Sequence, residues 1–128
     1  MPHPPPADEP QGALALVIRP IVSQGGSLVR LPANELAAST AIHDLVGGFY
    51  EAIGGPDWIA YTAEDERHFP EGLLPNLHAD ALVRVLGFHW QHGDYAKGTL
   101  VFLGREGVGN VDVPQRVLDL AHVAGLLK

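Results

Sequence analysis

The sequence predicts an α+β fold, in which a single domain holds a mostly antiparallel or mixed sheet of about five strands, with two or three helices packed on one face. Short apolar segments alternate with turn-forming residues, which is the pattern of strands joined by tight connections. Other segments place apolar residues at helical spacing. Because strands that follow one another through short turns tend to pair, the order of the elements favours an antiparallel or mixed sheet that carries helices.

The length and the proline distribution define the domain boundaries. A chain of 128 residues, 46% of them hydrophobic, is the size of one domain and can bury a core without disulfides or metals. The segment Met1–Gly12 differs from the rest because five of its residues are proline, which lacks the N–H that a sheet needs. We therefore expect residues 1–12 to be a disordered proline-rich tail and residues 13–128 to be the domain.

The first elements of the domain are a hairpin and a helix. Leu14–Ile18 is apolar on both faces, as in a central strand, and Leu28–Leu31 returns after a glycine-rich turn. Asn34 is placed to cap a helix, and Gly47 is placed to end it in the left-handed conformation. Apolar residues at positions i, i+3, i+4 and i+7 form the buried face of this helix: Ala38, Ala41, Ile42 and Leu45.

The second half of the chain predicts three more strands and two more helices. In chain order they are the strands Phe49–Ile53 and Trp58–Tyr61, a short helix Ala79–Leu86, the strand Thr99–Leu103 and a final helix that has Pro114 in its first turn. The glycines Gly104, Gly107 and Gly109 predict a flexible connection before the final helix.

Composition and charge exclude several classes of function. The absence of cysteine excludes disulfides, thiolate zinc sites and thiol nucleophiles, and is typical of a reducing cytoplasm. A net charge of −7 argues against binding to a nucleic-acid backbone. No apolar run approaches the roughly 18 residues of a membrane span. We expect a cytoplasmic protein that binds neither nucleic acid nor membrane and needs no cofactor.

The densest group of polar side chains is the segment that contains His89, His92 and Asp94. Two imidazoles and a carboxylate at this spacing could ligate a divalent metal, with a further protein ligand supplied by His68 or His78. Glycine beside Asp94 indicates a turn, where neither helical nor strand spacing applies. These residues are therefore only weak metal candidates, and surface histidines in a loop are the simpler interpretation.

A second group of candidates surrounds the glycine pair that follows the first helix. Glu51 lies in an apolar strand, where burial would raise the pKa of its carboxyl, or where it would face water or pair with an arginine. Pro75 and Asn76 form a rigid segment, although Asn76 could simply cap the helix near Ala79. We expect no catalytic residue, and we predict a binding rim formed by Gly47, Gly48, Glu51, Pro75 and Asn76.

Four segments in order carry a resemblance to a known family. Leu45–Glu51 resembles the L-V-G-G-Y-[IF]-E signature of the family catalogued as domain of unknown function 3846, which occurs in bacteriophages, plasmids and Gram-positive genomes. Gly72–Asn76, Gly98–Gly104 and Asp112–Pro114 are similar to three later segments of the same family. The resemblance implies a small accessory protein of a mobile element and assigns no reaction.

These observations support three functional hypotheses. The first is a non-enzymatic accessory protein of a phage or plasmid that binds a host protein or a small ligand, with counter-defence as its role. The alternative is a small metal-dependent or acid–base hydrolase that uses His89, His92, Asp94 or Glu51. The third is a self-assembling module that acts as a homo-oligomer.

Overall fold

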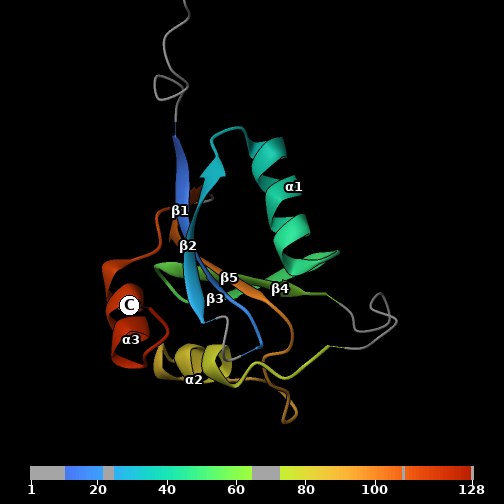
Figure 1. The fold of residues 1–128 in the computed structure, drawn as a ribbon, viewed down its shortest axis with the longest axis vertical. Coiled ribbons are helices and arrows are strands. Elements are labelled where there is room, and N and C mark those ends of the chain that lie inside the picture. The colour runs from blue at the N-terminus through green and yellow to red at the C-terminus, as the bar shows by residue number, and fades with distance from the viewer. Residues whose placement is uncertain (1–10, 22–24, 65–72, 108, 128) are drawn as a thin grey trace, which may run out of the picture.

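The computed structural model describes residues 11–21, 25–64, 73–107 and 109–127. It contains an antiparallel sheet in which the strand order is β2-β1-β5-β4-β3 and β6 pairs with β5 (Figure 1). The strands are β1 (Gln11–Ile18), β2 (Gly26–Pro32), β3 (Tyr50–Gly54), β4 (Trp58–Ala63), β5 (Leu100–Glu106) and β6 (Gly109–Val111). The helices are α1 (Glu35–Val46), α2 (Leu77–Val85) and α3 (Gln115–Val123). The predicted α+β class is confirmed.

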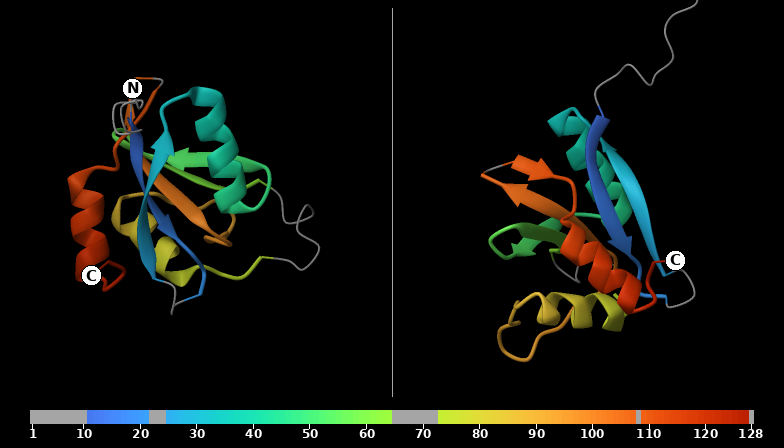
Figure 2. Two further views of the ribbon diagram at one scale, coloured as in Figure 1. Left: turned by 45° about the horizontal axis from the view of Figure 1, so that its top comes forward. Right: turned by 90° about the vertical axis from the view of Figure 1, so that its left-hand side faces the viewer.

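The helices cover both faces of the sheet, which corrects the prediction that they share one face (Figure 2). Leu16 and Ile18 of β1 belong to a core with α2 and α3, whereas Ala15 and Val17 belong to a second core with α1. Successive side chains of a strand point to opposite faces. Since β1 is apolar at every one of these positions, a helix layer on one face alone would leave half of them in water.

The tail boundary also changes. β1 begins at Gln11, so Gln11 and Gly12 belong to the strand and not to the predicted tail, while residues 1–10 lie outside the described residues. The register between β1 and β2 shifts between Gln11 and Leu14, which indicates a bulge. Arg30 of β2 donates a hydrogen bond to the Gly12 carbonyl at 3.1 Å across this bulge. The bulge therefore lies where β1 approaches the site described below.

The helix α1 has both predicted ends. The side chain of Asn34 accepts a hydrogen bond from the Ala37 backbone N–H at 3.0 Å. Gly47 has φ 93°, and its N–H bonds to the His43 carbonyl, so it satisfies a carbonyl that the helix would otherwise leave unpaired. Ile42 and Val46 are buried against the sheet.

The helix α2 starts two residues earlier than predicted because Asn76 caps it. The Asn76 side chain accepts from the Ala79 N–H at 3.0 Å and donates to the carbonyls of Ile18 and Gly98 at 2.9 and 2.8 Å. Asn76 is only 1% exposed. One amide thus joins the start of α2 to the end of β1 and to the segment before β5, and it uses both of its N–H donors to do so.

The predicted flexible connection after Leu103 is a β-hairpin. β5 continues to Glu106, and β6 returns beside it with Gly104 opposite Val111. Any side chain at Gly104 would collide with the Asp112 carbonyl, so glycine is required for this pairing. At least one glycine of the cluster therefore serves the close approach of two backbones and not flexibility. The final helix starts at Gln115, with Pro114 in the capping position just before it.

The β5–β6 hairpin divides the sheet. β1 pairs with β5 through residues 100–102, whereas Gly104 pairs with Trp58 of β4 on one side and Val111 of β6 on the other. β6 therefore pairs with the part of the β5 edge that β1 does not reach. From this point the β1–β2 hairpin and the β5–β6 hairpin diverge (right-hand view of Figure 2). Within the described residues, no helix is both long enough and apolar enough to cross a membrane.

Candidate functional site

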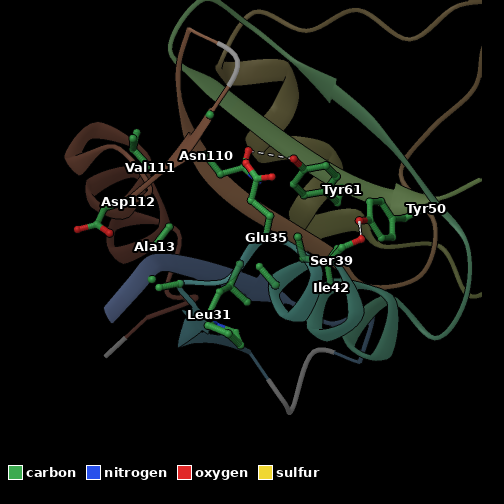
Figure 3. Close-up of a pocket in the computed structure, with 15 residues that line it drawn as sticks. Ala13, Leu31, Glu35, Ser39, Ile42, Tyr50, Tyr61, Asn110, Val111 and Asp112 are labelled. Carbon is green, nitrogen blue, oxygen red and sulfur yellow. Dashed lines mark hydrogen bonds between the residues drawn. The ribbon is translucent and has the colours of Figure 1, made fainter. Parts of the chain in front are cut away.

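A hollow of about 740 Å³ lies where the two hairpins diverge, on the face of the sheet that α1 covers (Figure 3). Residues from both hairpins, from α1 and from β3 and β4 line it. The lining consists of Gly12, Ala13, Leu31, Pro32, Ala33, Glu35, Ala38, Ser39, Ile42, Tyr50, Tyr61, Gly109, Asn110, Val111 and Asp112. We call this hollow the divided-sheet pocket.

Two hydrogen-bonded pairs supply most of the polar groups of the divided-sheet pocket. The Tyr61 hydroxyl donates to the Asn110 side-chain oxygen at 2.9 Å, and the hydroxyls of Ser39 and Tyr50 lie 2.7 Å apart. The two tyrosine rings meet edge to face with their centroids 5.1 Å apart. This contact holds both hydroxyls at fixed positions on the pocket wall.

Each of these pairs keeps hydrogen-bonding capacity for a ligand. A tyrosine hydroxyl that donates one bond still has lone pairs that accept, and an amide that accepts through its oxygen still has two N–H donors. Among the described residues, the Asn110 amide nitrogen has no protein partner. The pocket can therefore both donate to and accept from a bound molecule.

The charges that line the divided-sheet pocket are negative. Asp112 is already engaged, since one of its oxygens accepts from the Leu14 N–H at 2.8 Å and from Arg30 at 3.3 Å. Glu35, in the first turn of α1, has no ion pair among the described residues. In Figure 3 its side chain points from α1 toward the part of the wall that contains Asn110 and Tyr61. No lysine, arginine or histidine is among the described lining residues.

A second hollow, of about 600 Å³, brings together two candidate groups that the sequence analysis treated separately. Its lining includes Glu51 and Ile53 of β3 and the loop 88–94, with His89, His92 and Asp94. Partial burial, and then the negative charges of Glu64 and Asp94, raise the pKa of the Glu51 carboxyl. Of the two simpler alternatives for Glu51, the side chain is exposed to water, and an ion pair with an arginine is absent among the described residues. We call this hollow the histidine-loop pocket.

The histidine-loop pocket has other unusual features but no metal-ligand geometry. His92 has φ 55°, an uncommon conformation for a residue other than glycine, and the indole N–H of Trp90 is buried with no partner among the described residues. His89 and His92 are exposed. In the part of the chain that the structure describes, no three histidine or acidic side chains are grouped closely enough to hold a metal ion, and His68 lies outside it.

The predicted binding rim is not one surface. Asn76 is buried and bonded within the fold, so its position is the architectural alternative considered above, the cap of α2. Pro75 pairs with Lys97 in an isolated bridge. Gly47 and Gly48 both bond to the His43 carbonyl at the end of α1, and Glu51 lies on the histidine-loop pocket. The structure therefore brings Glu51 to the histidine loop and assigns the other four residues to helix ends and connections.

The residues of the divided-sheet pocket were not predicted as a site. Tyr61 and Asn110 are 49 residues apart in the chain, and Ser39 and Tyr50 belong to different elements. The local signal that existed was the presence of tyrosine in two mostly apolar strands, because a tyrosine in a half-buried strand usually needs a partner for its hydroxyl. Comparisons of the chain with family models, curated proteins and solved structures find no match. The resemblance to domain of unknown function 3846 therefore stays a prediction.

Proposed function

We propose that the protein is a small non-enzymatic binding protein and that the divided-sheet pocket is its binding site. The observation that carries this proposal is a hollow of about 740 Å³ whose wall holds hydroxyl and amide groups with unused bonding capacity. Its accessible apolar part, including Pro32 and Val111, is suited to the carbon skeleton of a ligand. Among the described lining residues the only serine, Ser39, bonds to a tyrosine and not to a histidine, which favours binding over nucleophilic catalysis.

The biological setting is part of the same proposal. The resemblance of Leu45–Glu51 and three later segments to a family of mobile elements supports an accessory protein of a phage or plasmid. A cysteine-free chain suits a reducing cytoplasm. A host protein that inserts a side chain into the divided-sheet pocket, or a small host molecule that enters it, would provide the means of counter-defence.

Ligand screening by protein NMR tests this proposal. A library of small polar and amphipathic compounds is titrated against the labelled protein, and the amide signals are followed residue by residue. We expect hits to shift signals of Ser39, Tyr61 and Asn110, and the shifts to disappear in Asn110→Ala. Gln115→Ala, a change of an exposed residue on α3, is the matched control and should keep them. Hits that consistently shift other regions, or a library without hits, would contradict the proposal.

A second candidate function has one specific observation in its favour. Glu51 has a raised pKa and shares the histidine-loop pocket with His89, His92 and Asp94, which is the environment of a general acid or base. If this pocket is catalytic, a screen of ester, glycoside and phosphodiester substrates should reveal hydrolysis that Glu51→Gln abolishes. Glu106→Gln, on β5, is the control for the loss of one charge. Activity that survives Glu51→Gln would exclude this site.

A further inference from the structure

We infer that the divided-sheet pocket recognises a cation, an alkylammonium or alkylguanidinium group at the end of an apolar stem. This inference rests on the proposed function, because it names the chemical class of the ligand for the same pocket. Such a group occurs in free amines and in the side chains of lysine and arginine on a partner protein. Both sources present the same chemistry to the pocket, and the experiment below separates them.

The distribution of charge is the first argument. The described lining contains two carboxylates and no basic residue, so an anion entering the pocket would be repelled and would lose its water without gaining a partner. The two carboxylates differ in availability. Arg30 and the Leu14 N–H already compensate Asp112, whereas Glu35 has no cationic partner among the described residues. A ligand cation would complete the pairing of Glu35.

The position of the hydrogen-bond acceptors is the second argument. Glu35 points toward the wall that holds Tyr61 and Asn110 (Figure 3). The Tyr61 oxygen, which already donates to Asn110, has lone pairs left to accept. An ammonium has three N–H donors and a guanidinium has five, so several acceptors around one carboxylate match such a group better than they match a neutral ligand with one donor.

The shape and the apolar part of the wall form the third argument. The volume of about 740 Å³ exceeds what a bare ammonium ion needs. Pro32, Ala38 and Val111 provide accessible apolar surface for a stem. The rings of Tyr50 and Tyr61 line the same pocket, and the face of an aromatic ring attracts a cation. Long basic side chains commonly place an apolar stem on such a surface while the charged end reaches polar groups.

Glu35 also has a purely structural role, which the test must separate from recognition. A carboxylate in the first turn of a helix stabilises that helix through the helix dipole. Glu35→Asp keeps this charge at the helix start but shortens its reach into the pocket. Glu35→Gln removes the charge. Asp44→Asn removes one charge from the same helix at its other end and is the matched control.

The experiment is an NMR titration with four small probes and one peptide at low ionic strength. The probes are n-butylamine, n-butylguanidinium, the neutral n-pentanol and the anionic pentanoate. The peptide has blocked ends and a single arginine. We expect at least one cationic probe or the peptide to bind about tenfold more tightly than n-pentanol, with pentanoate weakest, and we expect added salt to weaken the cation. Glu35→Gln and Glu35→Asp should reduce cation binding to the level of n-pentanol, and Asp44→Asn should leave it unchanged.

The outcomes separate the inference from the proposed function. Equal or tighter binding of n-pentanol or pentanoate at the pocket would overturn the cation inference while leaving a binding pocket in place. Cation binding unaffected by both Glu35 variants, each folded by its melting curve, would overturn the inference as well. If neither these probes nor the broader library shifts pocket signals, both proposals fall. Binding of the peptide without binding of n-butylguanidinium would identify a partner protein as the source of the cation, and the reverse result would identify a free small molecule.

Discussion

Two asparagines show how differently the two regions of the sheet are built. Asn76, at the closed end where β1 and β5 remain paired, is 1% exposed, and its side chain makes three hydrogen bonds within the fold. Asn110, at the end where the hairpins diverge, is exposed, and among the described residues its side chain accepts a single bond, from Tyr61. The same side chain thus completes a core in one region and is left with free donors in the other. A polar group with unused capacity on a rigid strand is a better indication of a binding surface than polarity alone.

The closed and open regions also differ in what packs around them. At the closed end, Trp58 stacks on Phe102 with centroids 6.2 Å apart, and α2 and α3 complete the core. At the open end, the ring contact of Tyr50 and Tyr61 faces a hollow. We therefore expect substitutions at the closed end to reduce stability and substitutions at the open end to reduce ligand binding. The four predictions below test this division.

Replacing Asn76 should have the largest effect. Asn76→Ala removes the cap of α2 and the hydrogen bond that the Asn76 amide donates to each of two buried carbonyls, those of Ile18 and Gly98. We expect the free energy of unfolding to fall by roughly 2–4 kcal/mol, as measured by urea denaturation. Asn110→Ala, the matched change at the open end, should cost less than about 1 kcal/mol. Comparable losses of stability for the two variants would contradict the division into a closed region that determines stability and an open region that binds ligand.

Replacing Gly104 should reduce both stability and ligand binding, because Gly104 pairs with β4 on one side and with β6, which lines the pocket, on the other. A methyl group in Gly104→Ala would collide with the Asp112 carbonyl and force β6 away from β5. We expect a loss of roughly 1–3 kcal/mol of stability, as for other overpacked sites, together with loss of ligand shifts at Asn110. The measurement combines a denaturation curve with the NMR titration. A variant that retained both properties would mean that the hairpin does not form the pocket wall.

Removing the Tyr61 hydroxyl should affect binding more than stability. Tyr61→Phe keeps the ring contact with Tyr50 but frees Asn110 from its hydrogen bond. Since this bond is exposed, we expect a loss of about 0.5–1 kcal/mol in the free energy of unfolding. Binding of the n-butylguanidinium probe should weaken severalfold in the same variant. A large loss of stability with unchanged binding would place Tyr61 with the closed core instead.

Glu51 should show the smallest effect and a defined pH dependence. Its raised pKa means that the folded state holds the proton more tightly than the unfolded state does. Stability from this group is therefore fully present below the unfolded pKa of 4.5 and is lost as the pH rises through the folded pKa. We expect Glu51→Gln to be more stable than the wild type at pH 7 by at most about 0.5 kcal/mol, since water screens an exposed carboxyl. The gain should vanish in melting curves recorded below pH 4.5, and Glu106→Gln serves as the control; a gain that persisted there would contradict the assignment.

Local chemistry explains which parts of the fold could be predicted from the sequence. Asn34 and Gly47 gave the ends of α1 correctly because capping depends on one residue and its immediate neighbours. The burial of β1 on both faces was equally visible, since Leu14–Ile18 is apolar at each position. The same apolar pattern also implies helices on both faces of the sheet, whereas the prediction placed them on one face.

The features that could not be predicted from the sequence depend on contacts between residues that are distant in the chain. Nothing local distinguishes Gly104 from other glycines, because its close contact with Asp112 exists only in the folded hairpin. The strand β6 therefore had no local signal. Glu51 and the loop 88–94 appeared as two unrelated candidates because only the folded sheet brings them together. The divided-sheet pocket exists because β1 leaves β5 after three paired residues, and no pattern in either strand states where that pairing ends.

The central position of β5 has a consequence for the order of events during folding. β5 pairs with β1 on one side and with β4 on the other, although Leu16 and its partner Phe102 come from opposite ends of the chain. On a ribosome, the β1–β2 and β3–β4 hairpins leave the exit tunnel well before the strand that unites them. Closing so distant a pair is slow, because a long loop must lose its freedom before any contact forms. Each hairpin therefore exposes its apolar face to solvent until β5 emerges. We expect the nascent chain to depend most on a chaperone during this interval.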